Sequence, residues 1–216
     1  MTHSAPNVLE RFLRYVQFDT QSDETSAAAP STAKQLKLAE ALKDELHQLG
    51  IANAVIGQGG VVYAHIPASP RCEDLPAVGF IAHMDTSPDA SGLHVKPQII
   101  RFDGTDVLLN QTEGIRFPVE RFPEIKKYIG EDVIFTDGTT LLGADDKSGI
   151  AAIMDMAAKI TADPTIAHAK LCIAFTPDEE IGRGTANFDL ERFGADWAVT
   201  IDGGEVGTLE NENFNA

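Results

Sequence analysis

The sequence predicts an α/β fold: a mixed, mostly buried sheet flanked by helices. Helical segments alternate with strands, the strands are apolar on both faces, and acidic clusters follow the strand ends. Strands that are apolar on both faces are typical of a sheet covered by helices. The 216 residues, 43% of them hydrophobic, suffice for one sizeable core.

Two helices are predicted before the first clear strands. Ser4 and Pro6 suit the start of the first helix, whose apolar face comprises Val8, Leu9, Phe12, Leu13 and Val16. The polar segment 19–30 is typical of a loop. We expect Ser31 to cap the second helix and Gly50 to follow its last turn. The apolar stripe of this helix is Leu38, Leu42, Leu46 and Leu49.

Later segments have the composition of buried strands, namely 61–66, 77–82, 170–175 and 197–201. Between them, segment 89–130 is rich in turn residues, resembles a hairpin and contains a short candidate strand at 98–102. Strand character resumes at 132–135. An Ala-rich helix is predicted over 147–160, and its apolar stripe indicates core packing rather than cofactor binding.

Charge and composition exclude several classes of protein. The chain carries 33 acidic and 17 basic side chains, a formal net charge of −16, so nucleic acid and anionic membranes are not expected partners. No apolar run approaches the roughly 20 residues of a membrane span, and the first residues are too polar for a secretory signal. Cys72 and Cys172 lack the spacing of a disulfide framework or metal knuckle, which favours a cytoplasmic location.

Acidic and imidazole side chains follow three of the predicted strands, at His83-Met84-Asp85, Asp178-Glu179-Glu180 and Asp202. A fourth cluster, Asp145-Asp146, opens the Ala-rich helix. Ligands of open α/β sheets bind beyond the carboxyl ends of strands, so we expect these clusters to converge. His83 and Asp85 share one face of an extended chain, and a carboxylate beside an imidazole supports metal binding. A histidine satisfied within the core is the alternative reading of this pair.

The other clusters also have a structural and a chemical interpretation. Helix capping explains one of Asp145 and Asp146, whereas a carboxylate that bridges two cations explains the second. Adjacent Glu179 and Glu180 can divide metal binding and proton transfer, or form a solvated acidic loop. Asp202 suits a metal site or an Asx-turn. Together, one histidine and several carboxylates suit Zn²⁺, Co²⁺ or Mn²⁺.

Five stretches resemble, in order and spacing, the co-catalytic zinc peptidases, a family that includes aminoacylase and carboxypeptidase G. They are 19–22, 79–89, 141–151, 174–182 and 202–204. The strings HMDTSPD and LLGADDKSGIA are similar to those of the tripeptidase branch. The resemblance implies a zinc-exopeptidase-like catalytic domain that is incomplete at its C-terminus. It also implies a metal-dependent aminopeptidase that releases the N-terminal residue from tripeptides.

The resemblance also implies roles for individual residues and two Zn²⁺ ions in a complete active site. The implied metal ligands are His83 and Asp202 for one ion, Glu180 for the other, and Asp145 as the bridge. Asp85 resembles the acid that orients the histidine, and Glu179 the general base that takes a proton from the bridging water. A cis peptide bond is expected between Asp145 and Asp146. Small peptides are the implied substrates.

Family members continue into a lid and dimerisation domain and then return to supply a second histidine ligand, but no histidine follows Asp202 here. We therefore expect residues 1–209 to form the N-terminal part of a catalytic domain and residues 210–216 to begin the lid domain. Little activity is expected of this chain alone. A homodimer is expected only with the lid domain, and an apolar sheet edge is expected to be exposed.

Other functions remain open from the sequence. Segment 133–140 echoes the haloacid-dehalogenase-like phosphohydrolases, but Phe135 stands where their nucleophilic aspartate would be, so Asp137-Gly138 is interpreted as a turn. A non-enzymatic module could bind one ion through His83, Asp145 and Asp202. Within the hydrolases, a dipeptidase or an N-acyl-amino-acid hydrolase is the nearest alternative.

Overall fold

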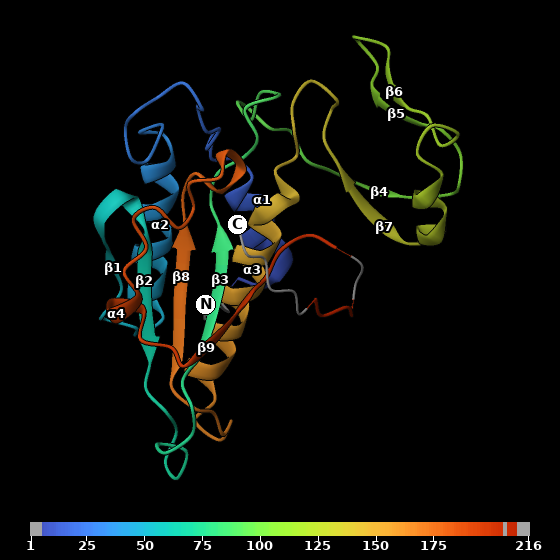
Figure 1. Ribbon diagram of the computed structural model, residues 1–216. Helices are drawn as coiled ribbons and strands as arrows, with labels where there is room; N and C mark the ends of the chain where they lie inside the picture. Colours follow the sequence, from blue (N-terminus) through green and yellow to red (C-terminus); the bar gives the residue numbers. More distant parts are fainter. Residues whose placement is uncertain (1–5, 205–206, 211–216) are drawn as a thin grey trace.

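A five-stranded mixed sheet forms the centre of the computed structural model, which describes residues 6–204 and 207–210 (Figure 1). The strands lie in the order β1 (Val55–Ile56), β2 (Val62–Ile66), β8 (Leu171–Thr176), β3 (Val78–His83) and β9 (Trp197–Thr200). The strand β3 runs parallel to β8 and β9, whereas β2 is antiparallel to β1 and β8. The predicted α/β class with a mixed sheet is confirmed.

Helices cover the two faces of this sheet unequally. The main core lies between the sheet and three helices, α1 (Val8–Tyr15), α2 (Gln35–Gln48) and α3 (Ala144–Ala162). The short helix α4 (Leu190–Phe193) covers the opposite face, where Phe193 belongs to a cluster with Tyr63 of β2 and with Cys172 and Ala174 of β8. The interior strand β8 is therefore buried at all six residues, as its apolar composition predicted.

A smaller β region projects from the sheet, at the upper right of Figure 1. It contains the antiparallel pair β4 (Gln98–Arg101) and β7 (Asp132–Phe135), the hairpin β5 (Val107–Asn110) and β6 (Ile115–Phe117), and the 3₁₀ turn η2 (Pro123–Tyr128). A separate core holds it together, made of Phe102, Val119, Ile125 and Phe135. Asp137 accepts hydrogen bonds from Thr139 and pairs with Lys96, which confirms a turn at this position.

The helix starts differ from those predicted. Ser4 lies outside the described residues, and α1 is capped by Asn7, which forms a reciprocal capping box with Glu10. The helix α2 begins at Gln35 rather than directly after Ser31, and its N-cap has no side-chain hydrogen bond. The prediction that Ser31 caps α2 is wrong because its hydroxyl donates to a carboxylate from a distant part of the chain. Gly50 ends α2 as predicted, with a φ of +87°.

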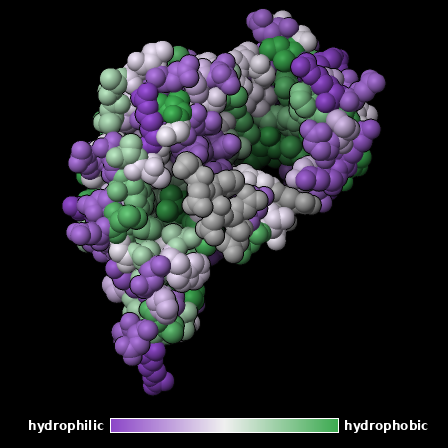
Figure 2. Space-filling model, viewed as in Figure 1, coloured by the Kyte–Doolittle hydropathy of each residue, from purple (hydrophilic) through white to green (hydrophobic). Residues whose placement is uncertain are grey.

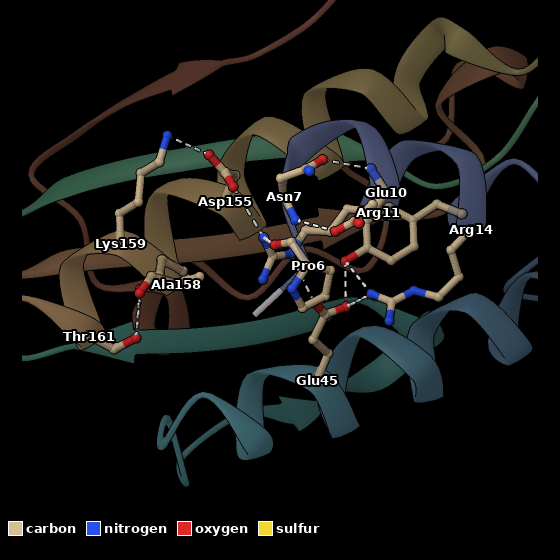
Figure 3. A network of polar contacts seen from close by, with 12 residues as sticks. Pro6, Asn7, Glu10, Arg11, Arg14, Glu45, Asp155, Ala158, Lys159 and Thr161 are labelled. Atoms are coloured by element: carbon tan, nitrogen blue, oxygen red, sulfur yellow. Dashed lines mark hydrogen bonds and ion pairs between the residues drawn. The ribbon is translucent and has the colours of Figure 1, made fainter. Parts of the chain in front are cut away.

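The buried face of α1 also differs from the predicted apolar stripe. Val8 and Leu9 are 46% and 40% exposed, whereas Arg11 is fully buried. The Arg11 guanidinium pairs with Glu45 of α2 at 2.9 Å and Asp155 of α3 at 3.1 Å (Figure 3). A buried charge is tolerated when it is paired and hydrogen-bonded, and such pairing between distant residues is invisible to an apolar pattern.

The strand β9 was predicted to be buried on both faces, and this prediction is wrong. It lies at one edge of the sheet and pairs with β3 alone among the described residues, so Trp197 is 54% exposed. The expected exposed apolar edge is therefore present at β9. The lid domain was expected to begin with residues 210–216, of which 211–216 lie outside the described part of the chain. None of the described helices is long and apolar enough to cross a bilayer.

Candidate metal site

His83 is the last residue of β3 and points its ring toward the start of α3. Its backbone N–H donates to Asp146 Oδ2 at 3.1 Å. One ring nitrogen, Nδ1, lies 3.1 Å from the Asp85 carbonyl oxygen and 3.5 Å from Asp85 Oδ1. The other, Nε2, lies 2.8 Å from Asp145 Oδ1. In the neutral ring, Nδ1 can donate to Asp85, which leaves Nε2 to bind a cation.

Asp145 and Asp146 begin α3 and have different surroundings. The peptide bond between them is cis, as predicted. The Asp145 side chain is 64% exposed, whereas Asp146 is fully buried. Asp146 accepts the N–H groups of His83 and Gly149, each at 3.1 Å. Asp146 thus joins β3 to α3, and Asp145 remains available to a ligand.

Asp202 follows β9 and lies close to His83 and Asp145. The backbone of Ile201, just before it, donates to Ile81 of β3 at 2.8 Å. A side chain at Gly149 would lie 2.3 Å from the Ile201 carbonyl oxygen, so glycine permits this close approach to α3. Ligand atoms of His83, Asp145 and Asp202 all lie within 4.8 Å of one another. Zinc ligands about 2 Å from one ion lie at most about 4 Å apart, so only a small closure is needed.

Glu179 and Glu180 lie on the 3₁₀ turn η3 (Glu179–Ile181), directly after β8. The Asp85 carboxylate accepts both of their backbone N–H groups, at 2.9 and 3.2 Å. Glu179 Oε2 lies 3.8 Å from His83 Nε2. Glu180 is not a member of the three-residue group, although it follows Glu179 on the turn. The structure therefore brings three predicted ligands together and places the two glutamates beside them.

The electrostatics of this cluster favour a positive charge. Burial lowers the pKa of His83, but neighbouring carboxylates, Asp85 foremost, raise it to about 10. Burial raises the pKa of Asp146 to about 7, with His83 opposing and Asp202 assisting the increase. Burial and the charge of Asp145 also raise the pKa of Glu180. A bound cation would relieve the repulsion among these carboxylates, and their oxygen and imidazole donors fit Zn²⁺, Co²⁺ or Mn²⁺.

Sequence reasoning assigned no separate task to three neighbouring residues. Asp146 supports His83, as described above. Lys147 is 1% exposed and donates to the Phe18 carbonyl oxygen at 2.8 Å, and burial lowers its pKa to about 8. Asp178, directly before Glu179, is 4% exposed. Asp146 and Lys147 are charged residues in a Gly-flanked string and Asp178 opens an acidic run, but the partner of each could not be read from the sequence.

Comparison with known proteins agrees with the resemblance in the sequence. The chain is 57% identical over 211 residues to peptidase T of Desulfitobacterium hafniense (strain Y51) and 54% identical over 210 residues to peptidase T of Clostridium acetobutylicum. Each match covers 97% of this chain and 51% of the relative, so the chain spans about half the length of these curated relatives. No family model matches the chain.

Solved structures show the same fold. The crystal structure of a tripeptidase from Staphylococcus aureus has a TM-score of 0.63 at 24% identity and covers 92% of this chain and 43% of its own. Aminopeptidase PepT from Bacillus cereus has a TM-score of 0.65 at 24% identity, with coverage of 93% and 44%. Sequence and fold thus agree: the chain is similar to peptidase T over nearly all of its own length and about half of the length of these relatives.

Proposed function

We propose that this chain carries a divalent-cation site of a metallo-aminopeptidase, a hydrolase that releases the N-terminal residue from tripeptides. One observation carries the proposal: ligand atoms of His83, Asp145 and Asp202 lie within 4.8 Å of one another, and Glu179 lies 3.8 Å from His83. The similarity to peptidase T supports the choice of reaction and substrate.

In this proposal His83 and Asp202 hold one ion, Asp145 bridges, and Glu180 serves a second ion. Zn²⁺ is the proposed metal, two ions in a complete site, with Co²⁺ and Mn²⁺ as chemically suitable substitutes. A divalent cation held there would lower the pKa of a water molecule and would polarise the scissile carbonyl. The exposed Asp145 side chain and the half-buried Glu180 leave the site open to solvent and substrate.

The remaining steps belong to side chains of this chain. Glu179 is proposed as the general base that accepts a proton from water and then gives it to the leaving amine. Its side chain is 52% exposed, so it can reach a substrate above the strand ends. Asp85 fixes the His83 ring and, through two backbone hydrogen bonds, the turn that carries Glu179. Asp85 is therefore proposed to position both groups relative to each other.

The substrate class follows from the same proposal. Small peptides are proposed as substrates, and a homodimer is proposed only for a protein that also contains a lid domain. Residues 1–209 are proposed to be the N-terminal part of the catalytic domain. Cys72 and Cys172 are both free thiols, which supports a cytoplasmic location.

Zinc titration by calorimetry, combined with a tripeptide cleavage assay, tests the function. Loss of a residue that supports a metal ligand typically weakens binding by about 10- to 100-fold, and His83→Ala, which removes a ligand, should weaken Zn²⁺ binding by more than this. His168→Ala should leave Zn²⁺ binding unchanged. In a protein that also contains the lid domain, Glu179→Gln should retain Zn²⁺ binding and lower cleavage by about 10²- to 10⁴-fold, with Glu191→Gln as the control. The 216-residue chain alone should cleave tripeptides little. Absence of Zn²⁺ binding by the unmodified chain contradicts the proposal.

The same measurements separate the hydrolase from a non-enzymatic module. The three-residue group could by itself hold a single ion, which is the specific observation in favour of the module. One tightly bound ion without any Glu179-dependent cleavage would support the module. Two ions with Glu179-dependent cleavage would support the hydrolase.

A further inference from the structure

Asp178 is the acid of the Asp178-Glu179-Glu180 string that neither cation binding nor proton transfer uses. It is 4% exposed and directly precedes the turn that carries the two glutamates. Its backbone has a φ of +61°, in the left-handed region that residues other than glycine seldom adopt. Such a residue needs surrounding contacts that hold its conformation.

Those contacts come from Ser31 and Gln35, which are distant in sequence. Asp178 Oδ2 accepts the Ser31 backbone N–H at 2.7 Å, and Oδ1 accepts the Ser31 hydroxyl at 2.5 Å. Gln35 donates from Nε2 to Asp178 Oδ1 at 2.6 Å and accepts the Asp178 backbone N–H at 3.2 Å. Gln35 is fully buried and Ser31 is 6% exposed. The side chain and the backbone of Asp178 are therefore both fixed.

The turn is held from its other side by Asp85. This carboxylate accepts the N–H groups of Glu179 and Glu180, the two residues that follow Asp178. Three consecutive residues are thus anchored: Asp178 to Ser31 and the first residue of α2, and the two glutamates to Asp85, just beyond β3. Since adjacent Cα atoms are about 3.8 Å apart, a displaced Asp178 also displaces the glutamates from His83.

We propose that Ser31 and Gln35 are positioning residues, which hold Asp178 and thereby set the place of Glu179 and Glu180 at the cation site. Their role in catalysis rests on the proposed function, whereas their hold on the turn can be tested independently of it. Ser31 therefore does not cap α2 but is proposed to hold Asp178, which is distant in the sequence.

Amide hydrogen exchange, resolved by NMR on the full 216-residue chain, tests the hold directly. Gln35→Glu keeps the size of the side chain but places a carboxylate against Asp178. Exchange of the Glu179 and Glu180 amides should accelerate at least about tenfold, equivalent to about 1.4 kcal/mol of lost protection. Gln48→Glu makes the same change on the exposed surface of the same helix and should leave these amides unaffected.

Ser31→Ala provides a milder variant, since it removes only the hydroxyl and retains the backbone N–H bond. It should accelerate the same two amides by a smaller factor, with Ser26→Ala in the same loop as the matched control. Amides of β8 should exchange at the original rate in all variants. Unchanged exchange at Glu179 and Glu180, or equal acceleration throughout β8, would overturn the proposal.

A Co²⁺ titration connects the turn to the metal. In the proposal, Ser31→Ala weakens Co²⁺ binding at least about threefold and alters the visible absorption of bound Co²⁺, whereas Ser26→Ala does neither. Identical Co²⁺ spectra and affinities in the two variants would contradict the link to the site. If the unmodified chain bound no Co²⁺, the proposed function would fail, and the exchange comparison would still decide whether Ser31 and Gln35 hold the turn.

Discussion

Two charged clusters of this molecule differ in how far opposite charges are paired within them. In the ion cluster between α1, α2 and α3, shown in Figure 3, Glu45 is met by Arg11, Arg14 and the Tyr15 hydroxyl, and Asp155 by Arg11 and Lys159. In the acidic cluster at the strand ends, the carboxylates of Asp85, Asp145, Asp146, Glu179, Glu180 and Asp202 surround one imidazole, that of His83.

The first cluster contributes charge that stabilises the fold, whereas the charge of the second is proposed to bind a cation. The Arg11 and Glu45 side chains are 0% and 9% exposed, and each carboxylate oxygen of Glu45 has a partner from the protein. The Asp145 and Glu179 side chains are 64% and 52% exposed and gather with like charges. Removing a charge should therefore destabilise the ion cluster and relieve the acidic one.

The largest effect is expected for Arg11→Ala. This change leaves Glu45 and Asp155 without their shared buried partner, and breaking a buried ion pair costs about 3 to 5 kcal/mol. Urea denaturation gives the loss in unfolding free energy. Lys43→Ala, which removes a cation from the surface of α2, should cost less than about 1 kcal/mol. Equal losses for the two variants would contradict the distinction between buried and surface charge.

Zinc should stabilise the chain through the acidic cluster alone. Binding at 100 times the dissociation constant adds about 2.7 kcal/mol to the unfolding free energy. Thermal unfolding with and without Zn²⁺ measures the gain, and a chelator should reverse it. The gain should disappear in Asp145→Ala and persist in Arg11→Ala, once the lower stability of the latter is taken into account. Persistence of the gain in Asp145→Ala would place the ion elsewhere.

Tyr15→Phe tests a single contact of the ion cluster. The hydroxyl donates to Glu45 at 2.6 Å, and burial, followed by the charge of Glu45, raises its pKa. Loss of a hydrogen bond to a charged group should cost about 1.5 to 3 kcal/mol by denaturation. Tyr128→Phe at a 39% exposed position serves as the control. A loss no greater than that of the control would show that Arg11 and Arg14 satisfy Glu45 without the hydroxyl.

Asp202→Asn should have the smallest effect on stability and the opposite sign. The side chain is exposed, and an amide oxygen can still accept the Gly203 N–H. Because the substitution reduces the repulsion among the neighbouring carboxylates, the metal-free chain should be equally stable or more stable by about 0.5 kcal/mol. Zn²⁺ binding should weaken. A clear destabilisation by denaturation would show that Asp202 has a structural role.

Much of this arrangement could be predicted from the sequence, and the exceptions share a cause. Local patterns identified β8 and α3 because long apolar runs fix burial and periodicity. They predicted that His83 and Asp202 lie close together because both come at the carboxyl ends of strands in the same sheet. They wrongly predicted that β9 is buried. Its exposure depends on the order of the strands, which is a property of the whole sheet.

Long-range polar contacts account for the remaining errors. Arg11 is buried because Glu45 and Asp155 come to it from two other helices. Ser31 does not cap α2 because its hydroxyl donates a hydrogen bond to Asp178 instead. Hydrogen bonds between residues far apart in the chain have no periodic signature, so a single sequence cannot indicate them.

The central claim is that the uncompensated acids around His83 form a binding site for divalent cations. Anomalous diffraction from crystals of the chain grown with Zn²⁺ locates the ion directly. The account predicts a peak about 2 Å from His83 Nε2 and from carboxylate oxygens of Asp145 and Asp202. A peak at other residues, or no peak at saturating Zn²⁺, would contradict it.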